Sequence, residues 1–254
     1  MLLVIDVGNS QTVFGLYDGS RLCHHWRLQT NRERTADEYG VLVGHLLRGV
    51  AGLQISGVTV SSVVPPLSTV IEDWCRRYLG RKPLLVGPGV RTGMPILYDH
   101  PAELGSDRLV NAVAAYERTR AATIVVDFGT ATKVDYVSAK GEYVGGVIAP
   151  GLGIASDALV ERAARLYRVE LVKPPQVVGR NTAHAIQSGL IYGFVALVDG
   201  LIARLQRETH TRARAIATGG FASLLGPESE RIDEVDEFLT LDGLRLIYER
   251  NSGH

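Results

Sequence analysis

Two short segments of this sequence each place an aspartate, a glycine and small polar residues directly after an apolar run. DVGNS at residues 6–10 follows an apolar run at 2–5, and DFGT at residues 127–130 follows one at 122–126. Glycine lets a backbone approach a phosphate closely, turn N–H groups can bind its oxygen atoms, and a strand-end aspartate can hold a cation. Either segment alone is equally compatible with an ordinary hairpin turn. Because the pattern occurs twice, we predict two turns that face each other across a cleft and hold a nucleoside triphosphate.

A third segment, GSDR at residues 105–108, lies at the start of a predicted helix, beside a loop rich in glycine and proline at 87–105. Phosphoryl transfer to an alcohol needs positioning, charge stabilisation and a carboxylate that accepts the hydroxyl proton. Asp107 is the best-placed carboxylate, and Arg108 can bind a substrate carboxylate or phosphate through two hydrogen bonds. The alternatives stay open, because Asp107 can also cap the helix and Arg108 can also be a surface charge.

Two further glycine motifs can bring a backbone close to a ligand. TGG at residues 218–220 follows a predicted strand and admits a flat ring such as adenine. GG at 145–146, with PGLG at 150–153, is not a dinucleotide fingerprint, because no apolar strand leads directly into a G-x-G-x-x-G that opens a helix. We therefore exclude an NAD site. Both motifs are equally compatible with turn glycines.

Other functional classes lack their motifs in this sequence. No glycine is followed by lysine, which excludes a Walker loop, and HExxH, GxSxG and metal-spaced Cys or His residues are missing. Lys plus Arg and Asp plus Glu are equal at 27 each, so no long-range positive field attracts a phosphate backbone. We expect no nucleic-acid partner.

The cysteines and the apolar segments indicate the compartment. Cys23 and Cys75 form no disulfide framework, so we expect free thiols in a reducing environment. The N-terminus has no basic segment and only a short apolar run before Asp6, unlike a secretory signal. No stretch approaches the roughly 20 apolar residues of a membrane span. We expect a soluble, cytoplasmic protein without a membrane partner.

The elements that must position these residues alternate between strand and helix, which is the pattern of an α/β fold. Residues 2–17 read as a hairpin, and Thr35 with Glu38 fits a capping box that opens a helix. Further strands are expected at 58–64, 83–86, 122–126 and 213–217, and helices at 67–79, 106–118, 156–166, 183–207 and 242–250. The repeated aspartate motif predicts two similar domains, residues 1–118 and 119–254.

Taken in order, these motifs resemble the type III pantothenate kinases, a family of the acetate and sugar kinase, Hsp70 and actin superfamily. The resemblance implies two actin-like (ribonuclease H-like) domains with mixed sheets flanked by helices and an ATP cleft between them. It also implies transfer of the ATP γ-phosphoryl group to the hydroxyl of pantothenate, giving 4′-phosphopantothenate, the first step of coenzyme A biosynthesis. The matching segments are DVGNS at 6–10, YDHPAELGSDR at 98–108, DFGTAT at 127–132, GGVIAPGLGIASDAL at 145–159, GRNTAHAIQSGLIYG at 179–193, TGGFA at 218–222 and LTLDGLRLIYERN at 239–251.

The resemblance further implies roles for individual residues. Asp107 falls on the proton acceptor, and Asp127 on the ligand of a monovalent cation (K⁺ or NH₄⁺), while Mg²⁺ is expected to bridge the phosphates. The active site is implied to lie near the interface of a homodimer. The implied ATP-binding residues are Asp6, Val7, Gly8, Asn9, Ser10, Gln11, Thr12, Val13 and Thr130, and the implied pantothenate-binding residues are Tyr98, Gly105, Ser106, Asp107, Arg108 and Thr182.

One residue departs from the family pattern. Lys133 stands where DFGTATT places its last hydroxyl residue, and it can add a positive charge near the phosphates or partly replace the monovalent cation. Two alternatives stay open at this point. One is a kinase of another hydroxylated metabolite, and the other is a non-catalytic, nucleotide-binding regulatory paralogue.

Overall fold

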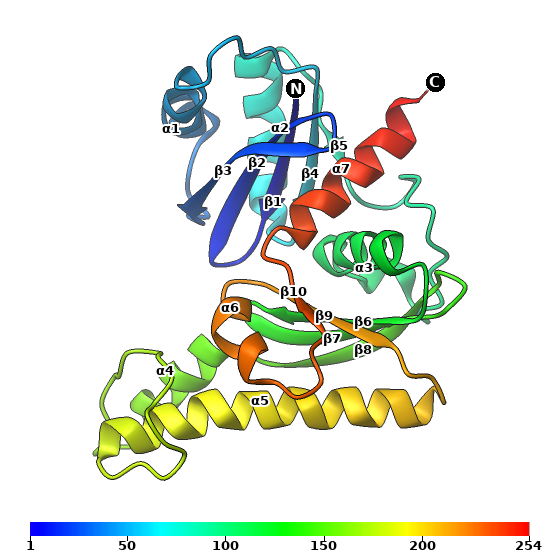
Figure 1. Cartoon of the computed structure of the whole chain (residues 1–254). Helices are drawn as coiled ribbons and strands as arrows, with labels where there is room; N and C mark the ends of the chain where they lie inside the picture. Colours follow the sequence, from blue (N-terminus) through cyan, green and yellow to red (C-terminus); the bar gives the residue numbers. More distant parts are fainter. Residues whose placement is uncertain (254) are drawn as a thin grey trace. The chain divides into compact units, whose positions relative to one another are not determined.

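The computed structural model describes residues 1–253 and groups them into two compact units (Figure 1). The first unit contains Met1–Met94, His100–Ala114 and the C-terminal segment from Thr240, and the second contains Pro95–Asp99 and Ala115–Leu239. The grouping differs from a single division after residue 118, because the chain passes between the units more than once. Where independently folding domains begin and end stays a prediction.

The sheet of the first unit has five strands in the order β3-β2-β1-β4-β5. The central strand β1 pairs antiparallel with β2 and parallel with β4. Residues 2–5 of β1 are all buried, as the near-continuous apolar run of a central strand requires. The outer pairs are β2 with β3, antiparallel, and β4 with β5, parallel. The bounds are β1 Leu2–Val7, β2 Gln11–Asp18, β3 Arg21–Gln29, β4 Gly57–Ser62 and β5 Leu84–Leu85.

Helices α1 (Ala36–Arg48) and α2 (Pro65–Leu79) share the core of this sheet. The predicted capping box is confirmed: the Glu38 N–H donates to Thr35 Oγ1 at 3.3 Å, and Glu38 Oε2 accepts the Thr35 N–H at 2.7 Å. Helix α2 begins two residues earlier than predicted, because prolines fit a first helical turn, where their missing N–H costs nothing. The remaining helices that begin or lie in this unit are a 3₁₀ turn Pro101–Glu103, α3 Ser106–Thr119 and α7 Leu239–Ser252.

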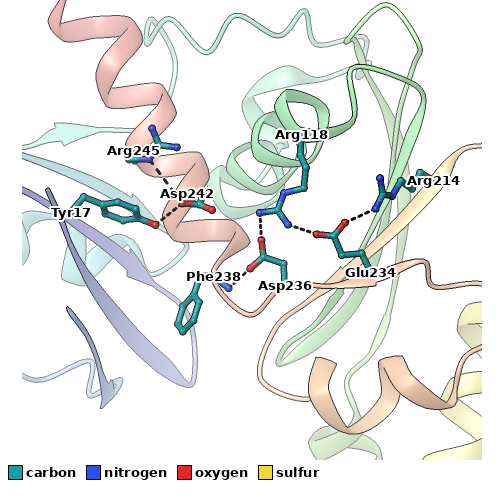
Figure 2. Close-up of polar contacts among 8 residues, drawn as sticks. All are labelled: Tyr17, Arg118, Arg214, Glu234, Asp236, Phe238, Asp242 and Arg245. Atoms are coloured by element: carbon teal, nitrogen blue, oxygen red, sulfur yellow. Dashed lines mark hydrogen bonds and ion pairs between the residues drawn. The ribbon is translucent and has the colours of Figure 1, made fainter. Parts of the chain in front are cut away.

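Helix α7 belongs to the first unit because specific contacts attach it to the sheet. The hydroxyl of Tyr17, on β2, is a hydrogen-bond donor to Asp242 Oδ1 at 2.8 Å (Figure 2). The Arg245 guanidinium lies 5.7 Å from the centroid of the Tyr17 ring. Gly15 leaves room for the Leu241 side chain, since a Cβ there would approach it to 2.9 Å. The last helix of the sequence thus completes the fold of its first strands.

The second unit repeats the topology of the first. Its strand order is β10-β9-β6-β7-β8, with β6 antiparallel to β7 and parallel to β9. Strand β7 pairs antiparallel with β8, and β9 pairs parallel with β10. Each strand therefore has a counterpart in the first unit, which confirms the predicted α/β fold with two mixed sheets. The bounds are β6 Thr123–Phe128, β7 Ala131–Val137, β8 Tyr143–Pro150, β9 Arg214–Thr218 and β10 Glu234–Val235.

The long helix α5 (Thr182–Glu208) runs along one face of the second sheet, in yellow in Figure 1, and supplies much of its core. Helix α4 (Leu152–Arg162) begins four residues before the predicted start, with Gly151 as its N-cap. A short α6 (Ala222–Leu225) and a 3₁₀ turn (Gly226–Glu228) follow β9.

By length and composition, α5 could cross a membrane, so the expectation that no stretch approaches such a span was wrong. Half of its most apolar window is buried inside the protein. Residues such as Ile191, Val198 and Ile202 are fully buried against the sheet. A core helix that packs a broad apolar stripe passes the same composition test as a membrane helix.

Candidate active site

The turn between β1 and β2 is held by Thr30, a residue that the sequence did not single out. The Gly8 N–H donates to the Gln11 carbonyl oxygen at 3.0 Å, and a Cβ on Gly8 would approach that oxygen equally closely. Thr30 Oγ1 donates to the Gly8 carbonyl oxygen at 2.8 Å, and the Thr30 N–H donates to the Ser10 carbonyl oxygen at 3.0 Å. The turn therefore has a defined shape before any ligand binds.

The predicted phosphate loop divides into buried and exposed residues. Thr12 Oγ1 lies 3.0 Å from Thr30 Oγ1 inside the turn. On the exposed side, Arg32 Nη2 donates to Asn9 Oδ1 at 3.3 Å and adds a positive charge that the motif did not predict. Val7 and Thr12 are buried, Asp6, Gly8 and Val13 are half-buried, and Asn9, Ser10 and Gln11 are exposed.

The structure brings the GSDR motif to the same sheet edge as Asp6. Asp6 is in register with Ser61 of the parallel strand β4. Ser61 Oγ lies 2.9 Å from Ser106 Oγ, and Ser106 Oγ accepts the N–H of Ser62 at 3.1 Å. Helix α3 therefore begins at the carboxyl ends of β1 and β4, the edge at which α/β sheets bind ligands.

The two charged residues of this motif have different environments. Asp107 is half-buried, and its Oδ1 accepts the N–H of Arg108 at 2.8 Å. A Cβ on Gly105 would approach that same oxygen to 2.6 Å, which explains the glycine. Arg108 is only 5% exposed, so the alternative of a solvated surface charge was wrong. The contact of Asp107 with the first turn of α3 is compatible with both a cap and a base.

In the second unit, three glycine motifs that were predicted separately meet at the turn after β6. A Cβ on Gly219, whose φ is +97°, would lie 2.5 Å from Asp127 Oδ1, and one on Gly129 would lie 3.2 Å from it. A Cβ on Gly151 would collide with the carbonyl oxygen of Thr130. Thr130 itself is exposed. The close backbone packing provides the kind of surface that can approach a phosphate or a flat ring.

Asp127 has a charged neighbour on the adjacent strand. Lys133 Nζ lies 2.9 Å from Asp127 Oδ2, and the two residues are in register across β6 and β7. Their side chains are 17% and 13% exposed, for Lys133 and Asp127 respectively. The residue that departs from the family pattern therefore contacts the residue for which a cation was predicted.

Tyr98 lies beside β8, near the first glycine of the pair at 145–146. Its ring centroid is 6.1 Å from that of Tyr143, and the two rings are tilted by 66°. Gly145 leaves space next to the Tyr98 ring, since a Cβ there would lie 3.9 Å away. Tyr143 is fully buried and donates its hydroxyl hydrogen to Asp135 Oδ1 at 2.7 Å. Tyr98 is thus supported by a fixed aromatic and carboxylate pair.

Thr182 is the first residue of α5, the long helix of the second unit. It is exposed, and the N-cap residue before it, Asn181, accepts the His184 N–H at 2.8 Å. It lines a pocket of about 690 Å³ formed by residues of α4 and α5 together with Leu166 and residues 179–181. Of the predicted site residues, Thr182 alone lines this pocket.

A cluster of four charged residues fixes the segment after β10 (Figure 2). Arg118, near the end of α3, binds Glu234 Oε1 and Asp236 Oδ2, each at 2.5 Å, and Arg214 Nη2 binds Glu234 Oε2 at 2.8 Å. Burial opposes the charge of Arg118, but Asp236 and Glu234 outweigh it and raise the pKa of Arg118. No motif in the sequence indicated this network.

Across residues 1–253, no three His, Cys, Asp or Glu side chains gather into a group that could hold a metal ion. Of the candidate site carboxylates, Asp6 and Asp107 belong to the first unit and Asp127 to the second.

Solved structures similar to this chain define its fold as the actin-like fold of sugar kinases. An inorganic polyphosphate/ATP-glucomannokinase from Arthrobacter sp. strain KM matches 100% of the chain, over 99% of its own length, at a TM-score of 0.50 and 14% identity. A Campylobacter jejuni protein described as a Baf family transcriptional activator matches 99% of the chain, over 100% of its own length, at a TM-score of 0.61 and 19% identity. At these identities the likeness concerns the fold alone.

Sequence comparison defines the family. The model of the type III pantothenate kinase family matches residues 2–204. The type III pantothenate kinase of Myxococcus xanthus (strain DK1622) is 56% identical over 253 residues, 99% of each chain. The chain belongs to the type III pantothenate kinase family.

Proposed function

We propose that this chain transfers the γ-phosphoryl group of ATP to the hydroxyl of pantothenate, giving ADP and 4′-phosphopantothenate. Its membership of the family supports this activity. The observation that carries the proposal is the hydrogen bond between Ser61 Oγ and Ser106 Oγ, at 2.9 Å. Because Ser61 is in register with Asp6, this bond places the GSDR motif beside the carboxyl end of β1. A candidate base and a phosphate-binding turn thus belong to one sheet edge.

The phosphate loop of residues 6–13 is the proposed binding site of the triphosphate. Its fixed turn offers backbone N–H groups and the exposed side chains of Asn9, Ser10 and Gln11. Because the turn is already braced by Thr30, little conformational entropy is lost when a phosphate binds. Thr130, exposed on the corresponding turn of the second unit, is proposed as a further ATP contact.

In the proposed reaction, Asp107 accepts the hydroxyl proton of pantothenate. The hydroxyl oxygen forms a bond to the γ-phosphorus as the bond to the ADP oxygen breaks, and the bonding electrons leave with ADP. The proton passes to the Asp107 carboxylate, whose Oδ1 is already oriented by the Arg108 N–H at 2.8 Å. A positioned base of this kind contributes about 10²- to 10⁴-fold to the rate. Mg²⁺ is proposed to neutralise the phosphate charge during the transfer.

The proposed pantothenate contacts come from both units of the chain. Gly105, Ser106 and Arg108 adjoin the base, and the buried Arg108 is suited to a carboxylate because its planar group offers two parallel donors. Tyr98 and Thr182 are proposed to complete the site. Thr182 lies in a pocket without the other site residues, so its participation is proposed together with a homodimer whose interface adjoins the active site. The proposed location of the enzyme is the cytoplasm.

The test is a direct assay of the purified protein with ATP, pantothenate, Mg²⁺ and K⁺. ADP is measured by a coupled assay, and the phosphorylated product by mass spectrometry. We expect ADP and 4′-phosphopantothenate in equal amounts. A panel of other hydroxylated metabolites serves as the comparison. Turnover of another metabolite, with none of pantothenate, would replace the proposed substrate. ATP binding without turnover of any of them would favour a regulatory protein.

A further inference from the structure

The side chains of Asp127 and Lys133 form an ion pair on one face of the second sheet. The two residues are in register, and Lys133 Nζ lies 2.9 Å from Asp127 Oδ2. Their neighbours Val126, Phe128 and Val134 belong to the core that includes α5. Because successive side chains of a strand point to opposite faces, Asp127 and Lys133 lie on the face away from that core.

A monovalent cation bound at Asp127 does not fit this arrangement. Such an ion takes oxygen ligands, whereas the lysine ammonium has only donors and no acceptor. Its fixed positive charge also repels a second cation a few ångströms away. An ion at Asp127 Oδ2 would have to displace Lys133, and both side chains are largely buried there. Thr218, in register with Asp127 on the other side, could offer a hydroxyl oxygen, but the carboxylate already carries its counter-charge.

We propose that the Lys133 ammonium takes the place of the monovalent cation, so that this chain needs neither K⁺ nor NH₄⁺. The proposal rests on the proposed kinase function for its activity readout, although its binding readout does not. An alkylammonium group is chemically an ammonium ion on a carbon tether, with the same charge and the same kind of N–H donor. Because it is covalently attached, its local concentration at the carboxylate does not depend on the K⁺ or NH₄⁺ concentration of the solution.

The first unit provides an internal comparison for the lysine. The position opposite Asp6 in the register of β1 and β2 is Val13, an apolar residue. The strand pair and its turn therefore form without a lysine at that place. Lysine is also rare in this chain, with four in the sequence: Lys82, Lys133, Lys140 and Lys173. Lys133 therefore adds a positive charge and is not needed for the geometry of the hairpin.

The experiment compares the wild-type chain with Lys133→Thr, which supplies a hydroxyl oxygen instead of the ammonium. Pantothenate-dependent ADP release is measured in KCl, NH₄Cl and tetramethylammonium chloride at equal ionic strength. We expect the wild-type rates to agree within about twofold, below the usual range of coupling between two ligands. For Lys133→Thr we expect stimulation by K⁺ or NH₄⁺ of about tenfold or more. Lys140→Thr, a change at an exposed lysine beyond the end of β7, is the matched control and should behave as wild type.

A second readout does not depend on activity. Thermal unfolding and the affinity for a fluorescent ATP analogue are measured in the same three salts. An ion that binds only the folded state raises its Tm by mass action, so K⁺ should stabilise Lys133→Thr relative to tetramethylammonium and leave the wild type unchanged. Stimulation of the wild type by K⁺ of about tenfold, or a K⁺-specific rise in its Tm, would overturn the proposal.

The two proposals fail in distinguishable ways. If the wild type turns over no pantothenate in any salt, the kinase function fails, while the Tm and nucleotide-affinity measurements still decide the role of Lys133. If Lys133→Thr is folded but K⁺ changes neither its rate nor its Tm, the proposal that Lys133 replaces the monovalent cation is wrong. If Lys133→Thr does not fold, the salt dependence of the wild type alone gives the decision.

Discussion

The ammonium of Lys133 lies 2.9 Å from Asp127 Oδ2, whereas the equivalent position opposite Asp6 is occupied by Val13. The two aspartates are the next-to-last residues of β1 and β6, the central strands of sheets with the same topology. The two turns therefore share a backbone design but differ in charge. The β6–β7 hairpin of the second unit contains the Lys133 ammonium. We therefore expect Asp127 to stabilise the second unit as well as to be a candidate site residue.

Asp127→Asn should destabilise the protein strongly. The substitution leaves the largely buried Lys133 ammonium without its counter-charge, which costs about 3–5 kcal/mol of unfolding free energy when a buried pair is broken from one side. Chemical denaturation monitored by circular dichroism measures the change. The control is the double variant Asp127→Asn/Lys133→Met, in which both charges are gone and most of the stability should return. If the double variant loses as much unfolding free energy as the two single variants together, the loss of the ion pair is not the cause of the destabilisation.

Asp107→Asn should reduce turnover by about a hundredfold or more, because an amide cannot accept the hydroxyl proton. The amide oxygen can still accept the Arg108 N–H, so the fold and ATP affinity should remain near wild type. Steady-state kinetics, isothermal titration with an ATP analogue and thermal unfolding together measure these effects. A lowered Tm with near-normal turnover would reduce Asp107 to a helix cap.

Gly219→Ala should disturb the turn after β6, whereas Gly220→Ala should not. A Cβ at Gly219 would lie 2.5 Å from Asp127 Oδ1, and the φ of +97° is unfavourable for alanine. The combined strain should cost about 1–3 kcal/mol and weaken nucleotide binding. A Cβ at Gly220 meets no atom within 4 Å. Differential scanning fluorimetry with and without an ATP analogue compares the pair, and equal effects of both variants would contradict the packing argument.

Cys75 should give the stability of the protein a dependence on alkaline pH. Burial, helped by the negative charge of Glu72, raises the pKa of the Cys75 thiol from 9.0 to about 12. The unfolded chain therefore loses this proton first, so the stabilising contribution is complete below pH 9 and is lost between pH 9 and about 12. The expected slope is about 1.4 kcal/mol per pH unit.

Denaturation of wild type and Cys75→Ala across this pH range isolates the effect, because other groups titrate equally in both proteins. The same burial predicts that one thiol, Cys23, reacts with a disulfide reagent at pH 8 in the native protein, and that both react in denaturant. A second native thiol that reacts rapidly, or equal pH profiles for the two proteins, would contradict the prediction.

Local signals in the sequence were sufficient for much of the fold. The capping box of Thr35 and Glu38 and the hairpin of residues 2–17 depend on interactions between near neighbours, and both are observed. The missed elements lack such signals. Strand β3 (Arg21–Gln29) is polar and half exposed at the edge of its sheet, and β10 has only two residues. Edge strands are defined by pairing with a neighbour, which no periodicity reveals.

In the candidate site, too, local motifs could be recognised from the sequence, whereas contacts between distant segments could not. Glycines at 129, 151 and 219 were recognised as three separate motifs, but their convergence on one turn follows from the register of β6 with β9 and from the return of β8. The burial of Arg108 was left open, because a single arginine in a helix carries no pattern that separates buried from solvated. Thr30 and Arg32 were missed because their partners in the turn lie some twenty residues earlier.

Residue type and short-range periodicity are properties of neighbours along the chain, so they were enough to indicate the candidate site residues and the alternation of strands and helices. Three relationships became visible only in the folded protein: α7 packs on the first sheet through Tyr17, Ser106 attaches the start of α3 to the end of β4, and Lys133 contacts Asp127. Those relationships depend on strand register and side-chain packing between segments distant in sequence, and their energies arise only when the folded chain removes both partners from water.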